Sequence, residues 1–356
     1  MSAIWFLRRV VELVASRPKI VRFPGERDGA ATTVQHSGSR LPIIDYGLHP
    51  AYGGMFEPDE ALRARAVAVL QPIVHEMQEI EAWKTRTFGY RYGHDDATGE
   101  QLARTGLFRF DLPARLMSPI CRACEPILAR IKAQVETMRA AGEAVHFKDR
   151  MQAITASTHA DQWSMIETML HEVGAYSLTA RYFGGRGAKL KAISVLLSQP
   201  ELKGSTPQLL PERGAPPTEG LHIDSAGVCI LKGVLYLDDV GPDQGPFGLV
   251  PGSHRWEEGS PGRVFRRAFD RSGLVARGIK ERRMFLSLPR QMQVKAEFGG
   301  DMMPDWPQTQ ALLRQESVSL GGRGLFSLFD PEAIHRGGQA RTGERRAILI
   351  TLRSRW

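Results

Sequence analysis

Two histidines and one aspartate, far apart in the chain, have the residue types and the spacing of a metal site. Asp224 follows His222 by two residues, so the two side chains point to the same side of an extended strand. His335 comes much later in the sequence. Two imidazoles and one carboxylate can occupy one face of an octahedral Fe(II) ion and leave the other face open for a chelating co-substrate and O2. The pattern predicts a metal-binding, catalytic triad of His222, Asp224 and His335, as in non-haem iron oxygenases.

Other histidines compete for these roles. His94-Asp95-Asp96 lies in a polar, turn-forming segment, and His159-Ala160-Asp161 precedes a helical pattern, where an aspartate is common as a cap. His254 is the competitor of His335, but it ends a Pro-Gly-Ser-His string that forms a tight turn. An imidazole at such a corner can simply bond to backbone. His222, Asp224 and His335 are therefore favoured as the metal ligands.

An arginine near the end of the chain fits a co-substrate that is a dicarboxylate. The alternate residues from Arg346 to Leu352 share one face of an expected strand, and a guanidinium among branched apolar side chains is unfavourable unless an anion pairs with it. Its planar fork of donors matches a carboxylate. Arg346 is therefore predicted to bind the far carboxylate of the co-substrate. Arg345, if the register is shifted by one, and Arg341 are weaker candidates.

Three further residues are candidates for contacts with the substrate. Tyr236 lies on the strand expected after the metal pair, and Arg181 and Tyr182 lie on an earlier expected strand. Packing or surface positions are the alternative for each of them. The Pro-rich segment 203–220 is either a lid over the site or a plain connection.

The elements that must position these residues follow from the periodicity of the apolar side chains. Helical spacing occupies 58–83, 112–141 and 164–173, whereas 175–183, 190–197, 228–237 and 345–352 have the character of strands. Short strands separated by turns are typical of an antiparallel sandwich or jelly roll. The expected fold is mainly β with helical cover, in a single catalytic domain 1–356. A mostly helical portion, 1–173, would pack on a core formed by 174–356.

Composition indicates a soluble globular protein. The chain has 356 residues, of which 42% are hydrophobic and 24% charged, and its three cysteines make an odd number. An odd number argues against a disulfide scaffold and fits a reducing compartment, so a cytoplasmic location is expected. Segment 4–14 resembles an amphipathic helix and is too short and too charged to span a bilayer. It either packs on the protein or contacts a membrane surface peripherally.

The positive net charge does not by itself indicate nucleic-acid binding. The 47 basic residues are spread along the chain beside 39 acidic ones, for a formal charge of +8. The densest basic runs, at 263–271 and 280–283, suit an anionic substrate or form a solvated loop. We expect a small-molecule or lipid-like substrate, for which an anionic group is one option, and no nucleic-acid partner.

Several motifs together resemble the phytanoyl-CoA dioxygenase (PhyH) family of Fe(II)/2-oxoglutarate-dependent oxygenases. They are Leu221-His222-Ile223-Asp224, then Leu235-Tyr236-Leu237-Asp238-Asp239-Val240, then Gln244-Gly245-Pro246-Phe247-Gly248-Leu249-Val250-Pro251-Gly252-Ser253-His254, and finally His335 and Arg346. The string that ends at His254 stands between the two groups of metal ligands in the order that the family has. The resemblance covers roughly residues 175–356.

This resemblance implies a double-stranded β-helix core with Fe(II) on His222, Asp224 and His335. It also implies that 2-oxoglutarate is a co-substrate, held through its far carboxylate by Arg346, and that O2 is consumed. The implied reaction is hydroxylation or another oxidation of an unactivated C–H bond, with release of succinate and CO2. Asp224 stands where related halogenases have a small residue, which favours oxidation over halogenation. The alternatives are a non-catalytic jelly-roll binding protein with a vestigial metal site and an oxygenase that acts on nucleic acid or protein.

Overall fold

The computed structural model describes residues 59–88, 96–143, 145, 147–200, 220–224, 229–254, 268, 272, 283–284, 287–288 and 307–355. The chain forms two compact units, one of residues 1–90, 256–299 and 356, and one of residues 91–255 and 300–355. The expected single domain with a boundary at residue 173 stays a prediction. Segment 4–14, segment 203–219 and the basic run 263–267 lie outside the described residues. In the part of the chain that is described, no helix has the length and apolar character needed to cross a membrane.

The first unit contains the long helix α2 (Glu60–Phe88). Its buried residues recur at intervals of three or four, as the spacing over 58–83 predicts: Ala66, Leu70, Val74 and Met77. Asp59 caps the helix by accepting from the backbone N–H of Ala61 at 2.8 Å. The helix therefore has one apolar face, with its start set by the capping carboxylate.

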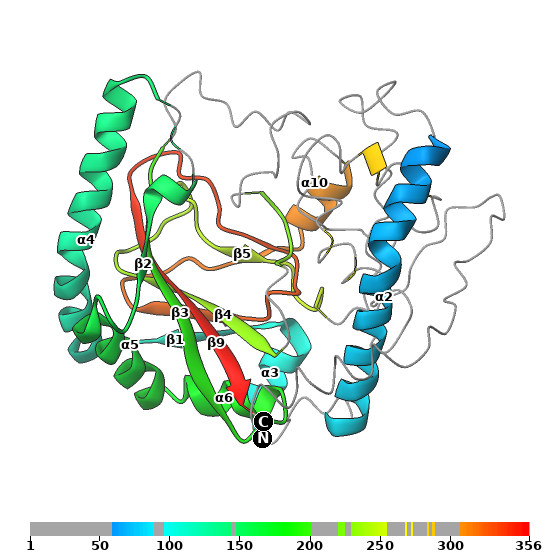
Figure 1. Ribbon diagram of the computed structural model, residues 1–356. Coiled ribbons are helices and arrows are strands. Elements are labelled where there is room, and N and C mark those ends of the chain that lie inside the picture. Colours follow the sequence, from blue (N-terminus) through cyan, green and yellow to red (C-terminus); the bar gives the residue numbers. More distant parts are fainter. Residues whose placement is uncertain are drawn as a thin grey trace. The chain divides into compact units, whose positions relative to one another are not determined.

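The second unit is built on two antiparallel sheets (Figure 1). The six-stranded sheet has the order β1-β7-β4-β9-β3-β2, and the three-stranded sheet has the order β6-β5-β8. The strands are β1 (Leu107–Asp111), β2 (Met151–Ile154), β3 (Gly187–Ser198), β4 (Ile230–Tyr236), β5 (Gly248–Leu249), β6 (Ser317–Val318), β7 (Leu325–Phe329), β8 (His335–Arg336) and β9 (Arg345–Arg355). These sheets form the jelly-roll core that the short strands predict. Strands β1 and β2, which form the two edges of the larger sheet, lie in the portion 1–173, where the sequence analysis identified helices and no strand.

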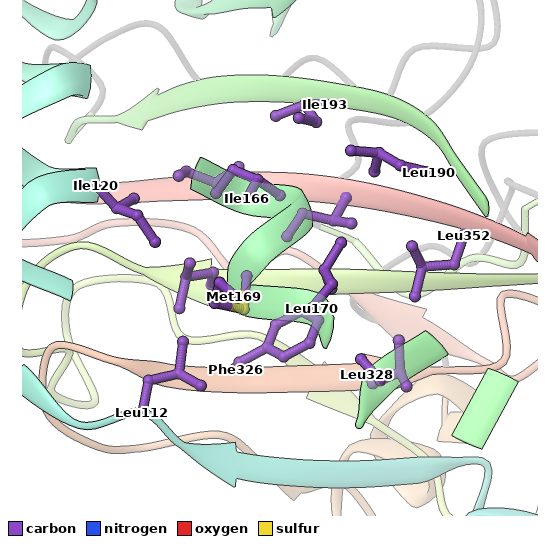
Figure 2. Close-up of a cluster of buried hydrophobic side chains, with 14 of the residues drawn as sticks. Leu112, Ile120, Ile166, Met169, Leu170, Leu190, Ile193, Phe326, Leu328 and Leu352 are labelled. Carbon is purple, nitrogen blue, oxygen red and sulfur yellow. The ribbon is translucent and has the colours of Figure 1, made fainter. Parts of the chain in front are cut away.

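Helices cover one face of the six-stranded sheet (Figure 1). They are α3 (Ala97–Thr105), α4 (Ala114–Ala140), α5 (Ala160–Glu172) and α6 (Ala175–Tyr182), while α10 (Pro307–Leu313) precedes β6. Figure 2 shows Ile166, Met169 and Leu170 of α5 packed among strand residues such as Ile193 and Leu352. The main apolar core of this unit therefore lies between the helices and the sheet.

The segment 175–183, which the sequence predicts to be a strand, forms helix α6 instead. Its buried residues include Ala175, Leu178, Thr179 and Tyr182, which is the spacing of one helical face. Gly174 precedes the helix with a φ of 73°, a left-handed conformation that glycine adopts without strain. A run of nine residues fits both periods, and packing against β3 and β9 selects the helix.

Strand β9 divides its side chains between two apolar clusters. Ile348, Ile350 and Leu352 belong to the core beneath the helices. Ala347 and Leu349 instead join the cluster between the two sheets, with Tyr236 from β4 and Phe247 beside β5. Odd-numbered residues of this part of β9 therefore face the interior of the jelly roll, called the inner face below, and even-numbered residues face the helices.

Gly248 makes room for a buried ion pair on the smaller sheet. The carboxylate of Glu316 accepts from Arg336 Nε at 2.6 Å and from Nη2 at 2.7 Å, and the side chain of Glu316 is 2% exposed. A Cβ on Gly248 would lie 1.9 Å from Glu316 Oε1. Glycine at this position therefore lets the carboxylate reach the strand that carries His335.

We predict that Gly248→Ala lowers the free energy of unfolding by about 1–3 kcal/mol, because the added methyl group displaces a buried, paired carboxylate. Gly187→Ala is the matched control, since a Cβ there meets nothing within 4 Å. Urea unfolding of the two variants measures the difference. Equal stability of the two variants would contradict the packing argument.

Candidate metal centre

The structure brings His222, Asp224 and His335 together. One ligand atom from each residue lies within 4.8 Å of the other two. Asp224 Oδ2 is 3.2 Å from His335 Nε2, and Asp224 Oδ1 is 3.8 Å from His222 Nε2. The two histidines pair as an antiparallel bridge, in which the backbone N–H of each donates to the carbonyl of the other at 2.8 Å. This pairing brings the ring centroids to 4.4 Å.

Each imidazole is oriented by a backbone carbonyl two residues before it. Nδ1 of His222 lies 2.8 Å from the carbonyl oxygen of Gly220, and Nδ1 of His335 lies 2.8 Å from that of Ala333. A carbonyl oxygen only accepts, so the proton of each neutral ring is on Nδ1. Both Nε2 lone pairs are then directed toward Asp224, which is the arrangement in which histidines bind metal ions.

Electrostatics favour the metal-binding protonation states of two of these groups. Burial, together with the nearby His335, lowers the pKa of His222 to about 4. Burial acts to raise the pKa of Asp224, but His335, Lys232 and His222 outweigh it, and the pKa lies well below its usual range. At neutral pH His222 is neutral and Asp224 is ionised. The donor set, two imidazoles and a carboxylate, therefore fits a divalent transition-metal ion.

Aromatic packing fixes the ring of His335. Its centroid is 4.8 Å from that of Phe329 on β7 and 6.0 Å from that of Phe247, and the two phenylalanine rings are 4.6 Å apart. His335 itself is 4% exposed. The two phenylalanines thus shield one side of the site from water.

The competing histidines have structural partners. His254 is buried, and its Nε2 lies 2.9 Å from the carbonyl oxygen of Ala103. The interpretation of His254 as a corner residue is confirmed. His159 directly precedes α5, also as expected from the sequence. In the third segment Asp96 caps α3 through the N–H of Gly99 at 2.7 Å, whereas His94 lies outside the described residues.

Arg346 does not face the metal centre, and the prediction that placed it there is wrong. It lies on the helix-facing side of β9, where its Nε and Nη2 donate to the carboxylate of Asp238 and its Nη1 donates to Glu125 of α4 at 3.0 Å. The alternate residues from Arg346 to Leu352 do share one face of the strand, but the anion that pairs with Arg346 is a carboxylate of the protein itself. The error concerns which face of β9 lies toward the metal centre: the face with Arg346, Ile348, Ile350 and Leu352 packs against the helices, and the opposite face lines the inside of the jelly roll.

Arg345 is the arginine on the inner face. It is 3% exposed, its Nη1 donates to the carbonyl of Gly337 and its Nη2 donates to Ser198 Oγ at 2.9 Å. Gly337 is two residues after His335, so the guanidinium lies against the strand that carries a triad histidine. Arg341, the remaining candidate, is exposed.

The three candidates for substrate contacts are engaged elsewhere in the protein. Tyr236 is buried and bridges the two sheets, because its hydroxyl donates to the carbonyl of Ser319 at 3.0 Å and accepts from the N–H of Phe247 at 2.8 Å. Tyr182 donates to Asp330 Oδ2 at 2.8 Å in a buried position. Arg181 pairs at the surface with Asp96 at 2.8 Å. Packing accounts for Tyr236 and Tyr182, and a surface ion pair accounts for Arg181. Arg181 and Tyr182 lie on helix α6 rather than on a strand.

Sequence reasoning missed Lys232 on β4. Its Nζ donates to Asp224 Oδ2 at 2.7 Å. The signal was present, since Lys232 is the charged residue in the otherwise apolar run from Cys229 to Leu237. A lysine in a buried strand needs a group of opposite charge beside it, and here that group is Asp224, the proposed carboxylate ligand of the metal.

Residues 218–348 match the family model of the phytanoyl-CoA dioxygenases (PhyH), and this range contains the whole triad and Arg345. This part of the chain is therefore similar to the PhyH family. The family resemblance drawn from the motifs is therefore confirmed. No curated protein sequence matches the chain.

Several solved structures of low sequence identity are similar to this chain. AviO1 from Streptomyces viridochromogenes Tue57 is 16% identical, with 72% of this chain and 94% of that chain covered and a TM-score of 0.38. SnoK, a non-heme alpha ketoglutarate dependent carbocyclase from nogalamycin biosynthesis, is 15% identical, with 72% and 82% covered and a TM-score of 0.39. EctD from S. alaskensis, crystallised with 2-oxoglutarate and 5-hydroxyectoine, is 14% identical, with 72% and 74% covered and a TM-score of 0.40.

We predict that His335→Ala weakens the binding of Co(II) by about a hundredfold or more, beyond the 10–100-fold loss expected for a group that only orients a ligand. Isothermal titration with Co(II) measures the affinity. His171→Ala, at an exposed position on α5, is the control and is expected to bind Co(II) as the unaltered protein does. Equal affinity of the two variants would exclude His335 as a ligand.

Proposed function

We propose that this protein is an Fe(II)/2-oxoglutarate-dependent dioxygenase. In the proposed reaction it hydroxylates, or otherwise oxidises, an unactivated C–H bond of a small-molecule or lipid-like substrate, with release of succinate and CO2. The observation that carries the proposal is the convergence of His222, Asp224 and His335, with both Nε2 atoms directed at one carboxylate. Similarity to an oxygenase family supports the same class of chemistry.

His222, Asp224 and His335 would hold the ferrous ion, which together with 2-oxoglutarate and O2 supplies the oxidising chemistry. The contribution of the protein is to bind, orient and exclude water. The carbonyls of Gly220 and Ala333 hold both rings with Nε2 toward the site. Phe247 and Phe329 shield the side at His335, which keeps bulk water from that side.

Arg345 would bind the distal carboxylate of 2-oxoglutarate. Its guanidinium is on the inner face of β9 and touches Gly337 close to the triad. A rigid fork of donors in a buried position recognises a planar carboxylate well. Its contacts with Gly337 and Ser198 hold that fork in one orientation. We therefore assign to Arg345 the binding of the far carboxylate that the sequence analysis expected of Arg346.

A cytoplasmic location is part of this proposal. All three cysteines, Cys121, Cys124 and Cys229, are free thiols. Burial raises the pKa of Cys124 to about 12, so this thiol stays protonated and unreactive at neutral pH. Free thiols and a ferrous centre both suit a reducing compartment.

The proposed activity is tested by the formation of succinate. We expect turnover of 2-oxoglutarate that requires Fe(II), that is stimulated by a member of a panel of acyl thioesters, free acids and amino acids, and that His222→Ala abolishes. The control is the exposed variant His171→Ala, which is expected to keep the activity. Succinate formation that persists in His222→Ala contradicts the proposal, and its absence across the whole panel favours a non-catalytic binding protein.

The two adjacent arginines provide a matched pair for the co-substrate site. We expect Arg345→Met to raise the KM for 2-oxoglutarate by about tenfold or more, the loss of a hydrogen bond between charged groups. Arg346→Met is expected to leave this KM close to that of the unaltered protein and to lower the midpoint of thermal unfolding, because it breaks the ion pair with Asp238. The opposite assignment of the two effects would restore Arg346 as the anchor.

A further inference from the structure

Lys232 shares the inner face of the jelly roll with the metal centre. It alternates on β4 with Val234 and Tyr236, both members of the cluster between the sheets. The register of the sheet places Phe329 of β7 and Thr351 of β9 on either side of it. A lysine at this position directs a positive charge toward the triad.

The ammonium group of Lys232 has donors to spare. Nζ carries three N–H donors, and within the described part of the chain one acceptor is present for them, Asp224 Oδ2 at 2.7 Å. The side chain of Lys232 is 33% exposed, so a ligand can reach the remaining donors.

The charges of the site favour the binding of an anionic ligand. Asp224 and Lys232 together are neutral, so a divalent ion on the triad leaves the site with an excess of two positive charges. A metal ion also draws the charge of Asp224 toward itself and weakens the attraction of the carboxylate for the ammonium. In a partly buried site such an excess strongly favours an anion close to the metal.

We propose that Lys232 is an anion-binding residue of this site: once Asp224 is engaged by a metal ion, the ammonium binds a carboxylate next to the metal. This inference rests on the proposed function. The carboxylate comes either from the end of 2-oxoglutarate that chelates the metal or from the substrate. The chemistry of recognition is the same for both sources, an ammonium beside a bound cation that together neutralise a carboxylate.

The test uses the full chain loaded with Co(II), which is not oxidised in the assay and whose absorption reports changes in its ligands. The unaltered protein is compared with Lys232→Met, which removes the charge, with Lys232→Arg, which keeps it, and with Lys189→Met. Lys189 is an exposed lysine on β3 and serves as the matched control. Affinity for Co(II) is measured first for every variant.

Two arms then distinguish the source of the carboxylate. The first titrates 2-oxoglutarate into each Co(II)-loaded protein. The second titrates octanoate, and octanamide as its neutral counterpart, at saturating 2-oxoglutarate. We expect Lys232→Met to weaken either 2-oxoglutarate or octanoate by about tenfold or more, while octanamide is unaffected. We expect Lys232→Arg to retain most of the affinity and Lys189→Met all of it.

The outcomes separate this inference from the proposed function. If the unaltered protein does not bind Co(II), the proposed metal centre itself fails. If Co(II) binds but Lys232→Met changes neither anion affinity by more than about twofold, the anion-binding role of Lys232 is overturned. Loss of Co(II) affinity in Lys232→Met with unchanged anion affinities also overturns it, because Lys232 would then only hold Asp224 in place.

Discussion

Two backbone hydrogen bonds between His222 and His335 are the constraint on which the proposed metal centre depends. Each residue donates its N–H to the carbonyl of the other at 2.8 Å, so residues far apart in the sequence lie directly opposite each other. Directly paired residues of antiparallel strands project their side chains on the same side, which brings both imidazoles to Asp224. The ion pair of Glu316 with Arg336 ties the strand of His335 to the edge strand β6 and thereby supports this pairing.

The alternation of side chains along the strands distributes the charged residues between two regions, the core beneath the helices and the inner face of the jelly roll. Arg346 points toward the helices, where Asp238 and Glu125 compensate its charge. Arg345 points to the inner face, as does Lys232, whose charge Asp224 compensates. A charge is stable inside a protein only beside a group of opposite charge. The groups that compensate each cation therefore indicate whether it supports the fold or is available to bind a ligand. The helix-facing pair holds the fold together, and the inner-face cations surround the proposed chemistry.

Long periodic segments were predictable from the sequence, and short ones were not. The pattern over 112–141 became α4, and the segments 190–197 and 345–352 lie within β3 and β9. The error at 175–183 concerns nine residues, too few for their apolar spacing to separate a helix from a strand. Strands β1 and β2 have five and four residues, and their conformation comes from pairing with β7 and β3, partners that local sequence does not reveal.

The sequence by itself determined the chemistry of the proposed centre: the types and order of its three ligands, the family motifs around them and the presence of an arginine pair after the last histidine. Only the tertiary structure decided which arginine faces the inner side, that Tyr236, Tyr182 and Arg181 are engaged by other parts of the protein, and that Lys232 reaches Asp224. The physical reason is that residue type and spacing are local, whereas the face a side chain occupies depends on register with neighbouring strands and on which side the helices cover. A shift of one residue in the pairing of a strand exchanges its two faces, and the spacing of residues in the sequence does not specify that pairing.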